Sequence, residues 1–245
     1  MNFKETRNII ERNKFNFIHL STTPSTMDDA KINLKKLKSN LVIIADQQTN
    51  GKGRRGNVWI SPPGNFYCSI IIKNDLPLKN YFFFSAIVAL SVRDSLKNNK
   101  VDNIKFKWPN DIFYEDKKFG GIILESYNFK NENYVIIGLG LNIVSAPEAK
   151  NYKTTFIQSF FKIKNIDLFL NIFFDNFFIK LNNLVDDNNL IEDFKKSLMF
   201  LNEKIIINDN NKNITGVFKG INNDGSLILS RNNKIISIYS GHIVL

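Results

Sequence analysis

The stretch KFKWPNDIFYEDKKFGGIILE, residues 105–125, decides the fold, because it holds three apolar runs separated by short polar turns. Short runs of β-branched and aromatic residues bounded by turn residues are typical of β-strands. We predict strands over 104–108, 112–114 and 119–125, and residues 134–143 continue the pattern as a fourth strand. Strands that are joined by tight turns pair antiparallel. The region therefore predicts a largely antiparallel or mixed sheet.

The rest of the first 198 residues supplies helices for the faces of this sheet. Apolar residues recur at helical spacing from Met27 to Leu37, behind an expected cap at Ser25 and Thr26. Because helices and strands are mixed along the chain without repeats, we predict one α+β domain over 1–198, with a mixed or antiparallel sheet flanked by helices. The other expected elements are strands at 41–45 and 69–72 and helices at 82–96 and 169–181.

After Met199 the sequence changes character. Short β-branched strands alternate with Asn, Asp and Gly turns, among them Asn223-Asp224-Gly225. This pattern predicts a small β-barrel or sandwich over 199–245. A unit of that size buries little apolar surface by itself, so we expect it to pack on the first domain.

The first strand of the opening stretch separates cations from apolar side chains. Lys105 and Lys107 share one face, because side chains alternate along a strand, and aromatic rings take the other face. Pro109 ends the strand and leaves Asn110 and Asp111 at its tip. A carboxylate and an amide in this position could hold Mg²⁺ or a ribose.

Glycines interrupt two of the predicted strands. Gly120 and Gly121 weaken a strand that is otherwise β-branched, which is expected where a ligand approaches the backbone closely. In the next strand Gly138, Gly140 and Asn142 fall on one face, which leaves that face hollow with a single amide at its end. An ordinary hairpin with a bulge, or a bulged edge strand, would also explain these glycines.

The glycine loop, residues 50–65, lies within the sequence QQTNGKGRRGNVWISPPGN of residues 47–65. It contains the string G-x-G-x-x-G, but a dinucleotide-binding fingerprint must open a helix, and two prolines and a glycine in residues 57–65 prevent one. It also fits the glycine-rich string of protein kinases, yet no H-R-D-x-x-x-x-N or D-F-G sequence follows. Both standard interpretations fail.

What remains is a glycine-rich loop with three cations, Lys52, Arg54 and Arg55, directly after a buried strand. Glycines let the backbone fold closely around an anion, and the guanidinium group matches the oxygens of phosphate or carboxylate. We interpret the loop as an anion clamp. The alternative is a flexible surface turn with solvated charges.

Composition excludes several classes of protein. The single cysteine, Cys68, cannot form an internal disulfide, and two histidines do not make a zinc site. No secretory signal pattern or membrane-spanning apolar stretch is present, so we expect a cytoplasmic protein without membrane contact. The net charge of +10 raises nucleic-acid binding as an alternative, although the lysines are dispersed among asparagine and isoleucine residues.

Taken together, these segments resemble the biotin protein ligases, with four motifs in the family's order across most of residues 20–145. The matches are Ser25-Thr26 to the Ser-Thr-Asn element, residues 48–64 to the G-R-G-R-R-G-x-x-W-x-S-P-x-G signature, residues 108–111 and 118–121 to K-W-P-N-D and K-x-x-G-I-L-x-E, and residues 138–142 to G-x-G-x-N.

Three positions depart from the family pattern. Met27 replaces the usual Asn, Lys52 replaces a usual Arg, and Asn57 stands where another basic residue is frequent. The resemblance also implies a catalytic domain similar to class II aminoacyl-tRNA synthetases and an SH3-like C-terminal barrel. Family members that repress transcription carry an N-terminal helix-turn-helix domain before the Ser-Thr element, which here arrives by residue 25. We therefore expect a ligase without DNA-binding function, as a monomer or homodimer.

The resemblance implies a reaction in which ATP and Mg²⁺ activate biotin as biotinyl-adenylate, followed by transfer to a lysine of a biotin carboxyl carrier protein. The implied catalytic residues are Arg54, Lys118 and Asp111, and Asp111 is also the expected Mg²⁺ ligand. The residues implied for biotin are Ser25, Thr26, Gln48, Gly51, Lys52, Arg54, Lys118 and Gly121. Those implied for ATP are Arg54, Arg55, Trp59, Lys107, Asn110, Asp111, Lys118 and Asn142.

Three alternatives stay open at this point. A lipoate protein ligase shares the fold and the adenylate chemistry, although the G-x-G-R-R-G and K-W-P-N-D strings favour biotin. A basic nucleic-acid-binding module would explain the charge. A ligand-binding pseudoenzyme is opposed by the presence of Arg54, Lys118 and Asp111. For Trp59 and Trp108, plain core packing is an alternative to a role at the ligand site.

Overall fold

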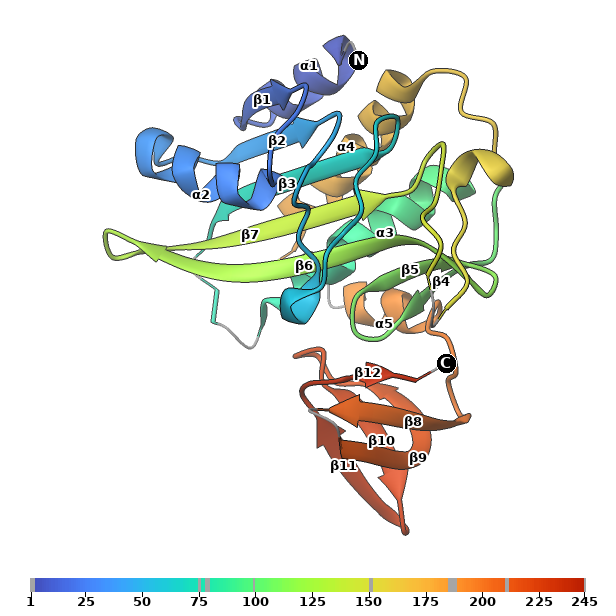
Figure 1. The fold of residues 1–245 in the computed structure, drawn as a ribbon. Helices are drawn as coiled ribbons and strands as arrows, with labels where there is room; N and C mark the ends of the chain where they lie inside the picture. The colour runs from blue at the N-terminus through green and yellow to red at the C-terminus, as the bar shows by residue number, and fades with distance from the viewer. Residues whose placement is uncertain are drawn as a thin grey trace.

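The computed structural model describes residues 3–74, 76–77, 80–98, 100–149, 152–184, 189–209 and 212–244, which form two β-sheets and their flanking helices (Figure 1). The helices are α1 (Lys4–Arg12), α2 (Thr26–Leu37), α3 (Phe82–Lys97), α4 (Ile166–Asn182) and α5 (Leu190–Lys195), with short 3-10 turns η1 (Arg54–Gly56) and η3 (Ile157–Ser159). The strands of the first sheet are β1 (Asn16–Leu20), β2 (Leu41–Ala45), β3 (Phe66–Lys73), β4 (Ile104–Lys107), β5 (Asp111–Tyr114), β6 (Lys117–Phe129) and β7 (Glu132–Leu141). Those of the second sheet are β8 (Lys204–Asp209), β9 (Lys212–Ile221), β10 (Leu227–Arg231), β11 (Lys234–Ile238) and β12 (His242–Ile243).

The seven-stranded sheet has the order β1-β2-β3-β7-β6-β5-β4. Only β1 and β2 are parallel, and every other neighbouring pair is antiparallel. The predicted mixed sheet is thus confirmed. The four strands that were predicted over residues 104–143, now β4 to β7, lie next to one another and form one half of the sheet. The ends differ from the prediction mainly at β6, which continues to Phe129 in a long hairpin with β7.

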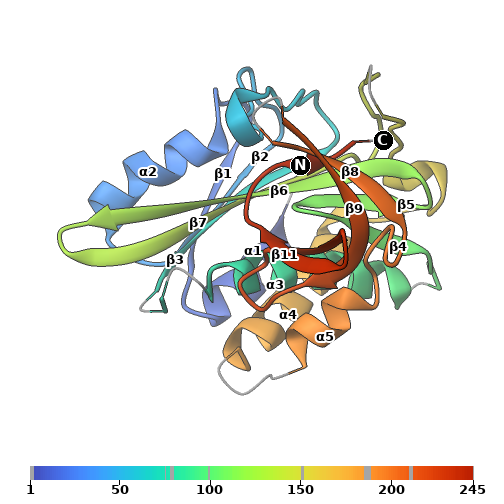
Figure 2. The same cartoon turned by 90° about the horizontal axis from the view of Figure 1, so that it is seen from below.

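Helices lie on both faces of this sheet around β2, and the burial of that strand shows this. Val42 and Ile44 point into the larger apolar core, which α3 and α4 complete, whereas Leu41 and Ile43 point to the other face under α2. All five residues of β2 are buried. A strand that is covered on both sides reads as a continuous apolar run instead of an alternating one. Figures 1 and 2 show α2 on one side of the sheet and α3 with α4 on the other.

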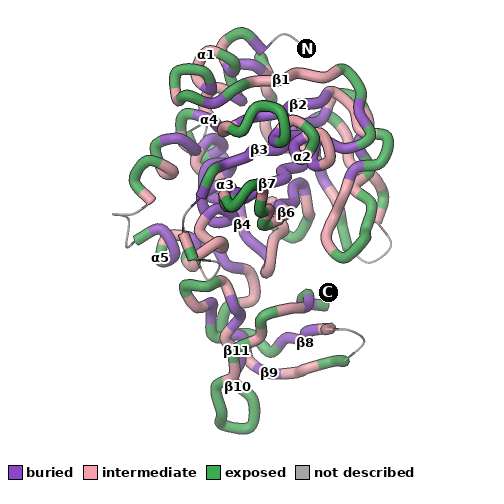
Figure 3. Tube along the Cα trace, turned by 90° about the vertical axis from the view of Figure 1, so that its left-hand side faces the viewer, coloured by how far each residue is buried: buried purple, intermediate pink, exposed green. Residues whose placement is uncertain are grey.

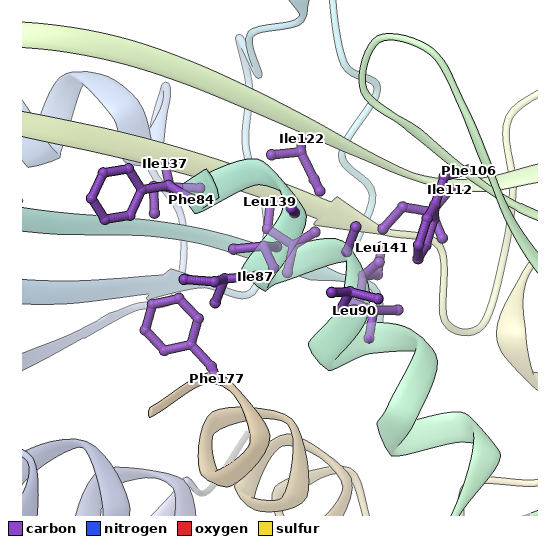
Figure 4. Close-up of a cluster of buried hydrophobic side chains, with 14 of the residues drawn as sticks. Phe84, Ile87, Leu90, Phe106, Ile112, Ile122, Ile137, Leu139, Leu141 and Phe177 are labelled. Atoms are coloured by element: carbon purple, nitrogen blue, oxygen red, sulfur yellow. The ribbon is translucent and has the colours of Figure 1, made fainter. Parts of the chain in front are cut away.

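Aromatic side chains fill the larger core. Phe169, Phe173 and Phe177 lie along one row of α4 at helical spacing and are buried against α3 and the sheet, as the periodicity predicts. In Figure 4, Phe177 from α4 and Ile87 from α3 lie close to the apolar side chains of the central strands. This packing makes the sheet a rigid platform for the loops at its edge.

The cap of α2 was predicted wrongly in one respect. Ser25 occupies the N-cap position, but its hydroxyl makes no capping hydrogen bond. Instead, the side-chain Oε1 of Gln48 accepts from the backbone N of Thr26 at 2.9 Å and from its Oγ1 at 3.1 Å. A residue from the segment after β2 thus satisfies the helix terminus, which local propensity does not reveal.

The second sheet has the antiparallel order β11-β10-β9-β8-β12 and accounts for the predicted β-rich unit at the C-terminus. It is attached to the first sheet through Trp108, whose Nε1 donates to the carbonyl of Gly225 at 2.8 Å. Trp108 is itself buried, as the packing interpretation predicts. Figure 3 shows purple, buried segments in the main sheet and, separately, in strands of this second sheet. In the described part of the chain no helix is long and apolar enough to cross a bilayer.

Candidate active site

A cavity of about 860 Å³ opens where the glycine loop, the central strands and the second sheet meet. One wall comes from the start of α2 and from Gln48, and the floor comes from β6 and β7. The glycine loop forms a second wall, and residues 241–244 of the second sheet form a third. Segments that are distant in the sequence therefore enclose one space.

Cations from two distant segments converge in this cavity. Arg54 Nη1 donates to Asn110 Oδ1 at 3.2 Å, and Lys118 Nζ lies 2.7 Å from Asp111 Oδ1. Asn110 lies in the connection from β4 to β5, Asp111 begins β5, and the paired strand β6 carries Lys118. The side chains of Lys118 and Asp111 are only 12% and 19% exposed, so water screens their charges weakly. The arrangement concentrates positive charge where two anions could be brought together.

Burial shifts the pKa values of the basic groups. It lowers the pKa of Arg54, and the adjacent Arg55 lowers it further while Asp111 opposes the shift. The pKa of Lys107 falls to about 8, mainly because the ammonium is buried and partly because Lys118 is close, while Asp111 raises it. Keeping Arg54 and Lys107 charged therefore costs desolvation energy. Such a cost is expected where a negatively charged ligand offsets it on binding.

Trp59 explains the glycines of the central strands. A Cβ atom on Gly140 would lie 2.5 Å from Trp59 Nε1, and one on Gly121 would lie 3.1 Å from its ring. Trp59 therefore packs directly on the backbone of β6 and β7 and fills part of the hollow face. Lys118 Nζ lies 5.3 Å from the centre of this ring and 5.1 Å from that of Tyr152. Two aromatic faces thus position this ammonium group.

The glycine loop is tied down at several points. Lys52 forms an ion pair with Asp28 in the first turn of α2. The carbonyl oxygen of Asn57 accepts from the backbone N of Gly53 at 2.7 Å, which closes a tight turn. A Cβ on Gly51 would lie 2.4 Å from the carbonyl oxygen of Trp59, so only glycine fits there. The loop is thus tied to α2 and closed by its own turn, while residues 55–58 at its tip are exposed.

A hydrogen-bonded chain forms one end of the cavity. Gln48 Nε2 donates to Ser61 Oγ at 2.9 Å, its Oε1 accepts from Thr26, and Ser69 Oγ donates to Thr26 Oγ1 at 2.8 Å. Met27 lies beside these groups and would contact a Cβ on Gly138 at 2.9 Å. Polar and apolar groups therefore alternate at this end, as a heterocyclic ligand with a hydrocarbon tail requires.

Two family models match the chain. The biotin/lipoate A/B protein ligase family matches residues 17–142, and the biotin protein ligase C-terminal domain matches residues 200–245. The chain belongs to the biotin/lipoate A/B protein ligase family. The first match contains the glycine loop and the strands of the first sheet that line the cavity, and the second contains the wall at 241–244.

Named relatives and solved structures agree with this membership. The chain is 33% identical to human biotin–protein ligase over 51% of its own length and 18% of the relative's. It is 31% identical to a biotin–[acetyl-CoA-carboxylase] ligase of Paracoccus denitrificans over 53% of its own length and 55% of the relative's. The matched region thus spans about half or less of these curated relatives. The biotin protein ligase from Aquifex aeolicus in complex with biotin and ATP shares the fold, with a TM-score of 0.77 and 24% identity over 93% of this chain and 97% of that one.

Most of the residues that the sequence predicted for the site line the cavity. They are Thr26, Gln48, Lys52, Arg54, Arg55, Trp59, Lys107, Asn110, Asp111, Lys118 and Gly121. Ser25, Gly51 and Asn142 lie behind its surface. Asn142 is buried at the end of β7, where its Nδ2 donates to the carbonyl of Thr155 at 3.2 Å. Its Oδ1 has no hydrogen-bond partner within the described ranges. The structure therefore brings Asn142 close to the supporting backbone and not into the cavity.

Several lining residues were not predicted. Tyr152 lies in the irregular segment after β7, and residues 241–244 come from the extreme end of the second sheet. His242 belongs to this wall, and its pKa is lowered, first by partial burial and then by Lys107 and Arg55. The local sequence around these residues carries no ligand-binding pattern, and only the docking of the second sheet places residues 241–244 at the cavity.

The side chains that could act as metal ligands decide whether Mg²⁺ fits in this cavity. Among the residues that the structure describes, no group of three or more His, Cys, Asp or Glu side chains is placed to hold a metal ion. Mg²⁺ is commonly held by one or two carboxylates together with substrate phosphates and water. Asp111 supplies one carboxylate beside the amide of Asn110, so the site fits an ion that arrives with a nucleotide.

Proposed function

We propose that this protein is a biotin protein ligase, which forms biotinyl-adenylate from biotin and ATP and transfers biotin to a lysine of a biotin carboxyl carrier protein. The observation that carries the proposal is the convergence of Arg54 and Lys118, from distant segments, on one cavity. Family membership, the fold shared with the solved ligases, and the polar and apolar groups around Gln48 and Met27 support it.

In the first step a biotin carboxylate oxygen attacks the α-phosphorus of ATP, and the bond to pyrophosphate breaks. A carboxylate is ionised at neutral pH, so this step needs no general base. The obstacle is the approach of two anions, which preorganised cations overcome. In our proposal Arg54 and Lys118 bind the α-phosphate and the biotin carboxylate. Arg55 and Lys107 face the remaining phosphates, and Mg²⁺ held at Asp111 would neutralise phosphate charge.

Binding of the biotin head group is assigned to the polar end of the cavity. The hydroxyl of Ser25 is buried directly behind the lining residue Thr26 and finds no partner among the described residues, and in our proposal a carbonyl of biotin that inserts at this end of the cavity bonds to it. Thr26, Gln48 and the backbone of Gly121 lie beside the same space. The remaining proposed biotin residues are Gly51, Lys52, Arg54 and Lys118, and the proposed nucleotide residues are Arg54, Arg55, Trp59, Lys107, Asn110, Asp111, Lys118 and Asn142.

In the second step the amine of the carrier lysine attacks the acyl carbon of the adenylate, and AMP leaves. A lysine is mostly protonated at neutral pH because its free pKa is about 10.4. We propose Asp111 as the group that accepts this proton. The proposal places the protein in the cytoplasm as a monomer or homodimer, with no role in binding DNA or membranes.

Exchange of labelled pyrophosphate into ATP tests the first step directly. We expect exchange that requires biotin and that lipoate does not support at similar concentrations. Exchange driven by lipoate and not by biotin would assign the protein to lipoate ligation. Absence of exchange with either acid would contradict adenylate formation.

A further inference from the structure

The two adjacent arginines of the glycine loop point to different partners. Arg54 donates to Asn110 at 3.2 Å, whereas Arg55 Nη2 donates to Asp209 Oδ1 at 2.8 Å at the end of β8. The backbone turns sharply between them, since Arg55 has a φ of 55° and Gly56 a φ of 77°. The left-handed region is less favourable for arginine than for glycine, and local bonds from Gly53 N to Asn57 O at 2.7 Å and from Asn57 N to Arg54 O at 3.1 Å close this turn. The contact with Asp209 adds a tie from outside the loop.

The partner carboxylate is itself held in place. Asp209 Oδ2 accepts from Ser240 Oγ at 2.7 Å. This bond and the contact with Arg55 both lower the pKa of Asp209, so the carboxylate is ionised at neutral pH. Ser240 directly precedes the cavity wall at 241–244. One carboxylate therefore joins the glycine loop to the wall that the second sheet contributes.

The contact between Arg55 and Asp209 offsets a repulsion between the two arginines of the loop. Arg54 and Arg55 are adjacent like charges in the loop, and the repulsion from Arg55 adds to the effect of burial in lowering the pKa of the half-buried Arg54. Without a counter-charge, Arg55 would move away into solvent or would compete with Arg54 for the same space. Asp209 offsets the charge of Arg55 from the side opposite Asn110 and keeps the two groups apart.

We propose that Asp209, supported by Ser240, is a positioning residue that holds Arg55 at the rim of the cavity and so orders the glycine loop for the nucleotide phosphates. The second sheet acts on the reaction through this contact. The inference rests on the proposed function for its effect on ATP, but its structural part concerns the loop alone. The two parts can be measured separately.

Hydrogen exchange of the loop amides 52–58 tests the structural part without any ligand. Asp209→Asn keeps the shape and removes the charge, and we expect these amides to exchange roughly 3–5-fold faster, the effect that a partly exposed ion pair supports. Asp209→Glu should restore most of the protection. Glu192→Gln serves as the matched control, because it removes a surface ion pair with Lys195 inside α5, remote from the loop. Unchanged loop exchange in Asp209→Asn would overturn the proposal.

The pyrophosphate-exchange assay tests the functional part. Asp209→Asn should raise the KM for ATP roughly 3–5-fold and leave kcat nearly unchanged, and Asp209→Glu should rescue it. A fall in KM would show that Asp209 competes with the nucleotide for Arg55, which contradicts a positioning role. If the parent protein shows no exchange at all, the ligase proposal fails, and the hydrogen-exchange result still decides whether Asp209 orders the loop.

Discussion

Lys118 has the most constrained environment of the cavity cations. Its ammonium group lies 2.7 Å from Asp111 and faces the rings of Trp59 and Tyr152. A charge that is held by a carboxylate and two aromatic faces is preorganised, so it needs little reorganisation when charge develops on a phosphoryl oxygen. The resemblance implies that Lys118 binds the α-phosphate and the biotin carboxylate, which stays a prediction, and it did not indicate Tyr152.

Replacing Lys118 by Ala should lower biotin-dependent pyrophosphate exchange by ~10²–10³, the usual loss for one preorganised donor. Lys117 provides a matched control, because it neighbours Lys118 in sequence, is exposed and does not line the cavity. Lys117→Ala should retain the parent rate. A near-normal rate in Lys118→Ala would remove this lysine from the mechanism.

Burial of the Lys107 ammonium group costs stability in the free protein. Its pKa of about 8 lies below the ordinary value of 10.5, so between these pH values the unfolded chain binds more protons than the native protein. Stability must therefore rise with pH across this window, and below pH 8 the buried charge costs about 3 kcal/mol. We expect Lys107→Met to increase the free energy of unfolding at pH 7 by up to that amount.

Denaturant unfolding of Lys107→Met and the parent at several pH values checks this expectation. The difference in stability should shrink as the pH rises from 8 towards 10.5, while the variant uses ATP poorly at every pH. Lys105→Met is the control from the same strand face, since Lys105 is only half-buried. A constant stability difference over this pH range would show that the ammonium group of Lys107 is not desolvated.

At the scale of elements, the sequence indicated that β6 and β7 present a glycine face. It did not indicate which residue packs against that face. Gly121 and Gly140 pair directly across these strands. The pattern predicted a hollow face at this position and a ligand above it. The structure shows that Trp59 occupies part of that face, a contact between elements that no local pattern specifies. The predicted cap of α2 was wrong for the same reason, because the capping side chain, Gln48, comes from another segment of the chain.

Gly140→Ala should displace Trp59, since the added Cβ would lie 2.5 Å from its indole nitrogen. Overpacking of this kind typically costs about 1–3 kcal/mol, and the glycine loop should become less ordered. A double-mutant cycle measured by urea unfolding provides the check. Trp59→Ala makes room for the new methyl group, so Gly140→Ala should cost much less in that background. Additive costs would show that the two residues do not touch.

At the scale of the whole molecule, the second sheet completes a cavity that the first sheet begins. The change in composition after Met199 predicted a separate β-rich unit that packs on the main domain, and the boundary between 198 and 199 stays a prediction. The sequence did not predict that residues 241–244 form a cavity wall, because this depends on how the two sheets dock. Trp108 holds that docking through Gly225, a contact between residues far apart in the chain.

Trp108→Phe should loosen this attachment. It leaves the half-buried carbonyl of Gly225 without its donor, which costs about 0.5–1.5 kcal/mol, the net contribution of a typical hydrogen bond. The wall at 241–244 should then be less well placed, so the KM for ATP should rise. Urea unfolding and ATP titration measure the two effects, with Tyr239→Phe as the control, since that ring is 75% exposed. A loss of stability without any change in the KM for ATP would show that the docking contact does not affect the cavity.

The central claim is that cations from two distant segments join two anions in one cavity and pass the product to a protein lysine. Incubation with labelled biotin, Mg²⁺ATP and a biotin carboxyl carrier domain tests it most directly, with the label followed on the carrier by mass spectrometry of its peptides. The account predicts label on one carrier lysine, dependent on ATP and lost in Lys118→Ala. A carrier that stays unlabelled by the intact protein, or that is labelled equally well by Lys118→Ala, would contradict it.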